Sequence, residues 1–123
     1  MYKFLIYDSL LYMISTELLK GSLTTITLKM LALNGSMYGY DIIRKVNILT
    51  SGKIKLTIGA IYPVLHKLKK EGLVNIETKN FKKRTRIYYE LTKKGNSIAI
   101  EKINELNEFL EVVSIFCHLG TTI

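Results

Sequence analysis

Apolar residues recur every three or four positions in four segments of this chain, and that spacing predicts helices. The first covers about residues 22–33, with a start that could lie as early as Thr16, and it stops at Asn34-Gly35. The second follows Ser36, a candidate N-cap, and runs to Leu49. The third and fourth begin after the candidate caps Thr57 and Thr92; they run to Gly72 and to about Cys117.

Between the last two helices the apolar period changes from helical to two. Val74 and Ile76 alternate with polar residues, and so do Ile87, Tyr89 and Leu91, which predicts two strands of a hairpin. The expected loop between them spans residues 79–85 and carries four cations, with Arg86 as a fifth at the strand base. The segment 53–56 also alternates, which fits a short strand or an extended lead into the third helix.

Three helices, a hairpin with a basic tip and a long last helix follow the order of a winged helix-turn-helix domain with an added dimerisation element. We therefore expect an α+β fold that is mostly α. Residues 1–15 would form an N-terminal extension, expected to be helical, and residues 16–92 the DNA-binding domain. Residues 93–123 would form the C-terminal dimerisation helix and tail.

The helix between Thr57 and Gly72 has two dissimilar faces. Its apolar stripe consists of Ile58, Ile61, Leu65 and Leu68. The opposite face is small, polar and basic, and Gly59 and Ala60 leave the backbone near the N-terminus uncovered. Such an end can approach a large rigid surface closely, as a recognition helix does in a major groove. An ordinary amphipathic surface helix is the alternative.

The positive charge is concentrated in the middle of the chain. Residues 44–94 hold 14 Lys or Arg against 3 acidic residues, whereas residues 95–123 hold 1 against 4, and the formal net charge of the chain is +8. A localised basic surplus is typical of proteins that bind a polyanion, although a face for anionic lipid would have a similar composition.

Several classes of protein are disfavoured by the residues present. The single Cys117 cannot form an internal disulfide, which fits a reducing cytoplasm, and no Cys/His cluster indicates a metal site. No Ser-His-acid set, phosphate-binding Gly-rich loop or HExxH motif indicates an enzyme, so we expect neither catalysis nor a cofactor. Asp8 and Glu17 interrupt the apolar N-terminal run, so we expect no signal peptide and no membrane partner.

The last helix carries an apolar seam with heptad spacing, which predicts a homodimer. A strip of this length exceeds what one small domain can cover, although packing on the chain's own first helices is the simpler alternative. At the end of the seam, Cys117 and His118 also fit a buried small residue and a helix-end cation. The expected dimer-interface residues are Ala99, Ile103, Leu106, Leu110, Val113 and Cys117.

The motifs together resemble the PadR family of transcriptional regulators, in its subgroup with a single C-terminal helix. The likeness covers about residues 18–95. It is carried by LLKGSL at 18–23, YGYDI at 38–42, GAIYPVLHKL at 59–68, EGLV at 71–74, YY at 88–89 and LTKKG at 91–95. Asn80-Phe81 stands where the family's wing is often Gly-rich, and the chain lacks the Trp that some drug-binding members place between subunits.

The resemblance implies that Tyr62 and its helix enter the major groove, that Lys83, Arg84 and Arg86 line the wing, and that the last helix pairs subunits. It also implies control of the chain's own gene or of a neighbouring transporter or stress gene, with release by a small hydrophobic effector between subunits. The residues that we expect at the DNA are Tyr38, Thr57, Gly59, Ala60, Tyr62, Pro63, His66, Lys67, Lys70, Lys82, Lys83, Arg84 and Arg86.

The expected function is that of a sequence-specific DNA-binding regulator, a repressor that binds an inverted-repeat operator as a homodimer. The alternative is a winged helix used for protein association, or an antirepressor that pairs with another regulator. The fourteen central cations favour DNA, because a protein-only module has no use for them. For His66, a plain surface residue and a phosphate or base contact are both open.

Overall fold

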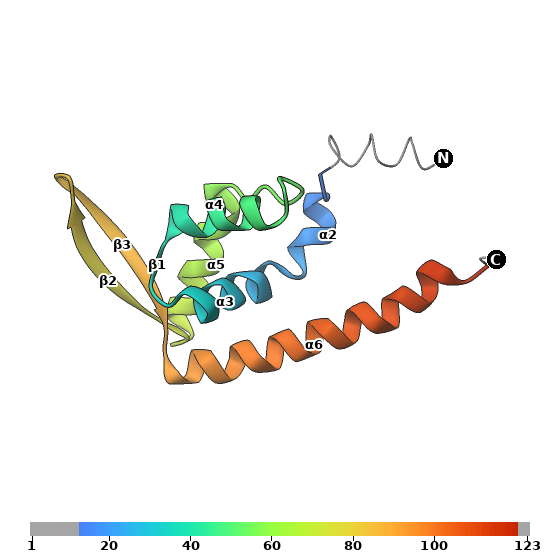
Figure 1. The fold of residues 1–123 in the computed structure, drawn as a ribbon. Helices are drawn as coiled ribbons and strands as arrows, with labels where there is room; N and C mark the ends of the chain where they lie inside the picture. The colour runs from blue at the N-terminus through green and yellow to red at the C-terminus, as the bar shows by residue number, and fades with distance from the viewer. Residues whose placement is uncertain (1–12, 121–123) are drawn as a thin grey trace.

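The computed structural model describes residues 13–120, in which a small antiparallel sheet lies at one side of the helices and its hairpin projects away from them (Figure 1). The helices are α2 (Thr16–Lys20), α3 (Leu23–Asn34), α4 (Gly39–Leu49), α5 (Ile58–Lys70) and α6 (Lys93–His118). The strands are β1 (Met37–Tyr38), β2 (Val74–Phe81) and β3 (Arg84–Leu91). The predicted α+β, mostly helical winged fold with a long C-terminal helix is confirmed. The helix expected in residues 1–15 lies, up to residue 12, outside the described residues.

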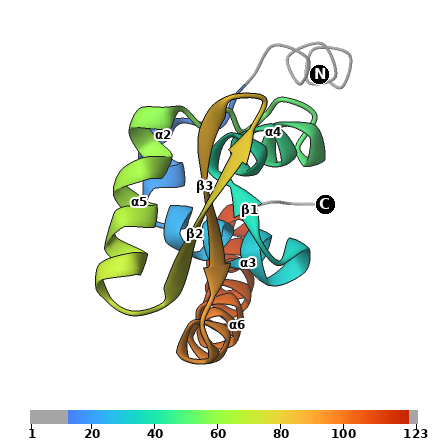
Figure 2. The same cartoon turned by 90° about the vertical axis from the view of Figure 1, so that its left-hand side faces the viewer.

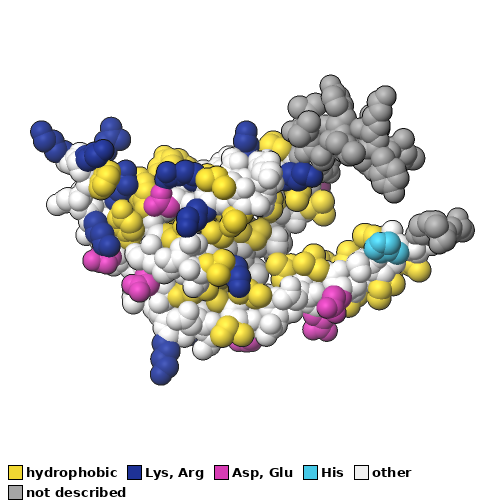
Figure 3. All heavy atoms as spheres, in the orientation of Figure 1, with side chains coloured by type: hydrophobic (Ala, Val, Ile, Leu, Met, Phe, Trp, Pro, Cys, Tyr) yellow, Lys and Arg dark blue, Asp and Glu magenta, His cyan; other side chains and the backbone are white. Residues whose placement is uncertain are grey.

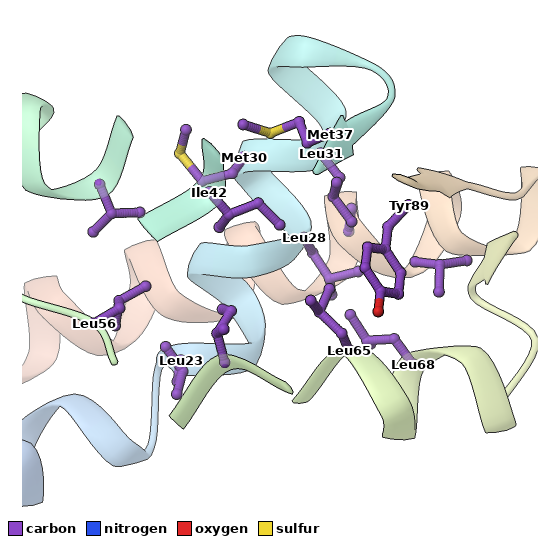
Figure 4. Close-up of a cluster of buried hydrophobic side chains, with 14 of the residues drawn as sticks. Leu23, Leu28, Met30, Leu31, Met37, Ile42, Leu56, Leu65, Leu68 and Tyr89 are labelled. Atoms are coloured by element: carbon purple, nitrogen blue, oxygen red, sulfur yellow. The ribbon is translucent and has the colours of Figure 1, made fainter. Parts of the chain in front are cut away.

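The core is built around α3, which lies between α5, α6 and the sheet. Its Leu28 and Leu31 are fully buried, as are Ile42 of α4 and Leu65 of α5 (Figure 4). Thr27 is also fully buried, and its hydroxyl donates to the carbonyl oxygen of Leu23 at 2.9 Å, so no polar atom is left unpaired there.

Local capping chemistry sets the bounds of α5, as the sequence predicted. The hydroxyl oxygen of Thr57 accepts from the amide of Ala60 at 3.2 Å. At the other end Gly72 takes a positive φ of 75°, its amide donates to Lys69 at 3.0 Å, and the amide of Leu73 donates to Leu68 at 2.9 Å. These two bonds form a Schellman motif, which turns the chain directly from α5 into β2.

The start of α6 is tied to that same turn. The Thr92 hydroxyl oxygen caps α6 by accepting from the amide of Gly95 at 3.0 Å, and the same hydroxyl donates to the carbonyl of Gly72 at 2.8 Å. The amide of Thr92 donates to the carbonyl oxygen of Leu73, also at 3.0 Å. A Cβ on Gly95 would lie 2.0 Å from that Leu73 oxygen, so only glycine allows this approach. Hence α6 leaves the domain in a defined direction.

Other details differ from the sequence-based expectations. Ser36 does not cap α4: Met37 and Tyr38 form β1, which pairs with β3, and Tyr38 is the N-cap residue. The segment 53–56 forms no strand: the chain bends at residues 53–54 and then continues without regular structure towards α5. The first predicted helix is divided at residues 21–22 into α2 and α3. Ile58, expected in the apolar stripe, is exposed because it lies in the first turn, beyond the core.

The hairpin is longer and its turn tighter than the sequence suggested. Strand β3 lies between β1 and β2, and the β2–β3 pairing continues from Val74–Leu91 to Phe81–Arg84. Only Lys82 and Lys83 remain in the turn, with φ of 48° and 65°, the left-handed geometry of a type I′ turn. Most of the predicted loop 79–85 is therefore strand, and its side chains are held in register.

Within the part of the chain that the structure describes, no helix is long and apolar enough to cross a membrane.

Candidate nucleic-acid interface

The sheet has one apolar face and one face of alternating aromatic and basic residues. Tyr89 and Met37 are buried against the helices. The pairs Tyr38–Tyr88, Lys79–Arg86 and Phe81–Arg84 are each in register, so their six side chains share the opposite face. We call these six residues the cation-aromatic face.

Cations and rings interleave on the cation-aromatic face. The guanidinium carbon of Arg86 lies 4.1 Å from the ring centroid of Phe81 and 4.7 Å from that of Tyr38. The ammonium nitrogen of Lys79 lies 4.8 Å from the ring centroid of Tyr88. These distances are typical of cation–π contacts. Tyr38 and Arg86 were expected at the DNA, whereas Tyr88 and Phe81 were not. The period-two spacing of Tyr88 with Arg86 was an available signal, but Phe81 reaches this face only through the pairing of β2 with β3.

The hairpin tip carries the predicted cluster of cations. Lys82, Lys83 and Arg84 are all exposed, and Figure 3 shows Lys and Arg side chains gathered at this end of the molecule. Neither of the two ion pairs in residues 13–120 involves them, since those pairs join Asp41 to Arg44 and Lys102 to Glu105. The tip is therefore a positively charged projection without acidic partners.

Helix α5 lies beside the hairpin (Figure 2). Its exposed face is basic and partly apolar. A shallow depression on this face is lined by Tyr62, Pro63, His66, Lys67 and Lys70. The last four are exposed, as are Thr57 and Gly59 at the helix start, whereas Ala60 is half-buried. Because Pro63 has no N–H, the carbonyl of Gly59 receives no helical hydrogen bond from it.

Tyr62 does not lie freely on this face. It is half-buried, and its hydroxyl lies 3.0 Å from the position that a Cβ on Gly39 would occupy. Burial, followed by the neighbouring Tyr38 and Tyr40, raises the pKa of Tyr62 above its ordinary value. Burial and the nearby Tyr62 likewise raise the pKa of Tyr89. The ring packs on the start of α4, so only its outward part is available for the expected contact with DNA.

The apolar seam of α6 divides into two parts. Ala99 is 1% exposed within the single chain and belongs to its core, so its assignment to a dimer interface is wrong. Ile103, Leu106 and Val113 are half-buried, while Leu110 and Cys117 are exposed. The last part of α6 carries further exposed apolar side chains, and another follows directly after the helix: Phe109, Val112, Ile115 and Phe116, then Leu119.

The described residues also include no group of three or more His, Cys, Asp or Glu side chains that could hold a metal ion.

The fold and its basic hairpin define a winged helix-turn-helix protein, and comparisons with known proteins place it within that class. The model of the PadR-like family of transcriptional regulators matches residues 27–101. The chain therefore belongs to the PadR-like family, whose members are DNA-binding transcriptional regulators and not enzymes.

Two solved structures and one further relative are similar to this chain over most of its length. A transcriptional regulator from Clostridium thermocellum is 25% identical, with a TM-score of 0.75, over 82% of this chain and 98% of that one. A PadR-like regulator from Bacillus cereus is 27% identical, with a TM-score of 0.69, over 83% of this chain and 97% of that one. An uncharacterized protein from Lysinibacillus sphaericus is 24% identical over 85% of this chain and 95% of its own length.

Proposed function

We propose that this chain is a cytoplasmic repressor that binds an inverted-repeat operator in double-stranded DNA as a homodimer. The observation that carries the proposal is the basic hairpin tip next to the exposed face of α5. A helix for the major groove and a neighbouring cationic projection for the backbone are the two elements that such recognition needs.

The two elements have different tasks in this proposal. The outward part of Tyr62, with Pro63 and His66, offers ring edges and apolar atoms to bases, while Lys67 and Lys70 border them as phosphate ligands. On the hairpin, Lys82, Lys83 and Arg84 are exposed and suit phosphates, to which they add affinity without sequence information. Thr57, Gly59 and Ala60 let the start of α5 approach the DNA closely.

The dimer is formed by the outer half of α6. Phe109, Leu110 and Phe116 are 59%, 56% and 69% exposed in the single chain, and a second copy would remove this surface from water. Ile103, Leu106, Val113 and Cys117 border the same surface. A two-fold axis presents two equivalent α5 helices, so the half-sites should lie one or two helical turns apart, roughly 34 Å per turn.

The proposed repressor is released from its operator by a small-molecule effector. A small hydrophobic ligand bound between the subunits, against the apolar surface of α6, would alter the spacing of the two α5 helices and release the operator. The regulated genes would be the chain's own gene or a neighbouring transporter or stress gene.

Footprinting on the DNA upstream of the chain's own gene tests this function. The proposal expects two protected half-sites related by inverted repetition and occupied by two subunits. Protection of one half-site by one subunit would contradict it. Absence of any footprint, together with capture of a different regulator by α6, would favour the alternative of a protein-association module or antirepressor.

Two variants of Tyr62 test the role of α5. Tyr62→Ala should reduce discrimination between operator and random DNA by about 1 to 3 kcal/mol if the ring contacts a base, with little change in salt dependence. It should also lower the melting temperature, because the ring packs on Gly39. Tyr62→Phe is the matched control, since it keeps the ring and its packing and removes only the hydroxyl.

A further inference from the structure

Arg86 occupies a special place among the cations of the hairpin. It lies on the central strand β3, and the two rings within 5 Å of its guanidinium carbon come from the strands on either side: Tyr38 of β1 at 4.7 Å and Phe81 of β2 at 4.1 Å. Arg86 is half-buried, whereas Lys82, Lys83 and Arg84 are exposed. Its side chain is therefore held in place before any ligand arrives.

Among residues 13–120, the hydrogen-bonding capacity of this guanidinium is unused. Glu77 shares the face, in register with Tyr88, but the ion pairs among residues 13–120 are Asp41–Arg44 and Lys102–Glu105. No acceptor in the same residues takes a hydrogen bond from the Arg86 side chain. Contacts with rings engage the guanidinium as a cation, while its five N–H donors remain available for a forked, anionic acceptor.

The two rings also connect parts of the domain that have separate roles. Tyr38 is the N-cap residue of α4, at the start of the helix-turn-helix, whereas Phe81 is the last residue of β2 before the hairpin turn. Through Arg86 the side chains of Tyr38, Arg86 and Phe81 form a continuous row from the helical core to the tip. This row fixes the guanidinium relative to α4 as well as to the hairpin.

We propose that Phe81 and Tyr38 are positioning residues, which hold the Arg86 guanidinium ready to bind a single DNA phosphate. The inference rests on the proposed DNA-binding function and deepens it. A phosphate is the expected ligand because its oxygens match the forked donors of arginine, and because the neighbouring Lys79 and Arg84 add positive potential. Holding the side chain beforehand removes part of the entropy cost of binding, which corresponds to roughly threefold to tenfold in affinity.

The test is a double-mutant cycle on the full-length chain with the DNA fragment upstream of its gene. Phe81→Leu keeps apolar bulk and removes the ring, so DNA affinity should fall about threefold to tenfold, while Phe81→Tyr should bind like the wild type. Arg86→Ala should weaken binding and lower the slope of log affinity against log salt by about 1. In the Arg86→Ala background, Phe81→Leu should have no further effect on affinity.

Arg84 provides the matched control, because it lies directly across from Phe81 in the register. In the Arg84→Ala background, Phe81→Leu should still weaken DNA binding by its full factor. In the DNA-free protein, the NMR signals of the Arg86 side chain should be displaced by ring currents, and Phe81→Leu should move them towards ordinary arginine values.

The inference is overturned if Phe81→Leu binds DNA like the wild type, or if it weakens binding equally with and without Arg86. If the wild-type chain binds DNA, either of these two results leaves the proposed DNA-binding function unaffected. Failure of the wild-type chain itself to bind DNA would instead remove the proposed function, and this inference with it.

Discussion

The hydroxyl of Tyr62 in α5 lies 3.0 Å from the point where a Cβ on Gly39 in α4 would stand. The absence of a side chain at the start of α4 is therefore what allows the Tyr62 ring to pack there. Glycine is costly inside a helix, and the close approach of the Tyr62 ring accounts for its presence at position 39.

Gly39→Val should lower the free energy of unfolding by about 1 to 3 kcal/mol, because the added methyl groups displace the Tyr62 ring. Adding Tyr62→Phe should restore part of that loss, since the hydroxyl oxygen is the nearest atom. Urea denaturation measures both effects. Gly59→Val is the control, because its Cβ would meet only the Thr57 hydroxyl at 3.9 Å. Equal losses from the two valine variants would contradict the packing argument.

Gly95→Ala should destabilise the chain by about 3 kcal/mol, because its Cβ would lie 2.0 Å from the backbone oxygen of Leu73. That overlap can be relieved only by moving α6 away from the turn after α5. Gly21→Ala is the matched control: nothing lies within 4 Å of its Cβ position, and its φ of −71° suits any residue. Similar urea midpoints for the two variants would show that α6 is not fixed by this approach.

Leu110→Asp combined with Phe116→Asp should convert a dimer into folded monomers. Both side chains are exposed in the single chain, so the carboxylates cost little there, but in an interface they would be buried without partners. Sedimentation equilibrium gives the molar mass, and circular dichroism checks the fold. Asn107→Asp, on an exposed position of the same helix, should leave the mass unchanged. An intact dimer of the double variant would exclude this surface as the subunit interface.

Lys82→Asn combined with Lys83→Gly should stabilise the hairpin by about 1 kcal/mol, because both lysines adopt a positive φ that Asn-Gly accepts at lower cost. Thermal melting provides the measurement. The pair removes two tip cations without straining the turn, so any decrease in DNA affinity would not come from unfolding. A lower melting temperature would mean that the type I′ turn is not the favoured geometry.

Local chemistry made much of the fold predictable from the sequence. The helix bounds set by Thr57, Gly72 and Thr92 depend on contacts a few residues away in the sequence. The structure confirms Thr57 and Thr92 as N-caps and Gly72 as the end of α5. β1 was missed because two residues are too short to show a period, and β1 exists only through its pairing with β3. Ala99 was misassigned because heptad spacing marks an apolar face without telling whether the chain's own core or a partner covers it.

The candidate site was predicted less completely than the fold. A run of cations between two predicted strands is visible in the sequence, so the exposed position of Lys82, Lys83 and Arg84 at the hairpin tip could be expected. The Phe81–Arg86–Tyr38 row joins residues from three strands, and its recognition needs the register, which the expected seven-residue loop concealed. Tyr62 illustrates the same limit, because helical spacing cannot reveal that the start of another helix covers part of its ring.

The salt dependence of DNA binding decides whether the basic hairpin binds the phosphate backbone of DNA. Affinity for the upstream DNA is measured against salt for the wild type, for Lys82→Asn with Lys83→Gly, and for Lys29→Gln with Lys102→Gln as a control of equal charge change away from the hairpin. We expect a steep wild-type slope, which the hairpin variant reduces by about 0.9 for each phosphate that it no longer neutralises, with the control unchanged. A hairpin variant with the full affinity and full slope of the wild type would show that the hairpin does not bind the backbone.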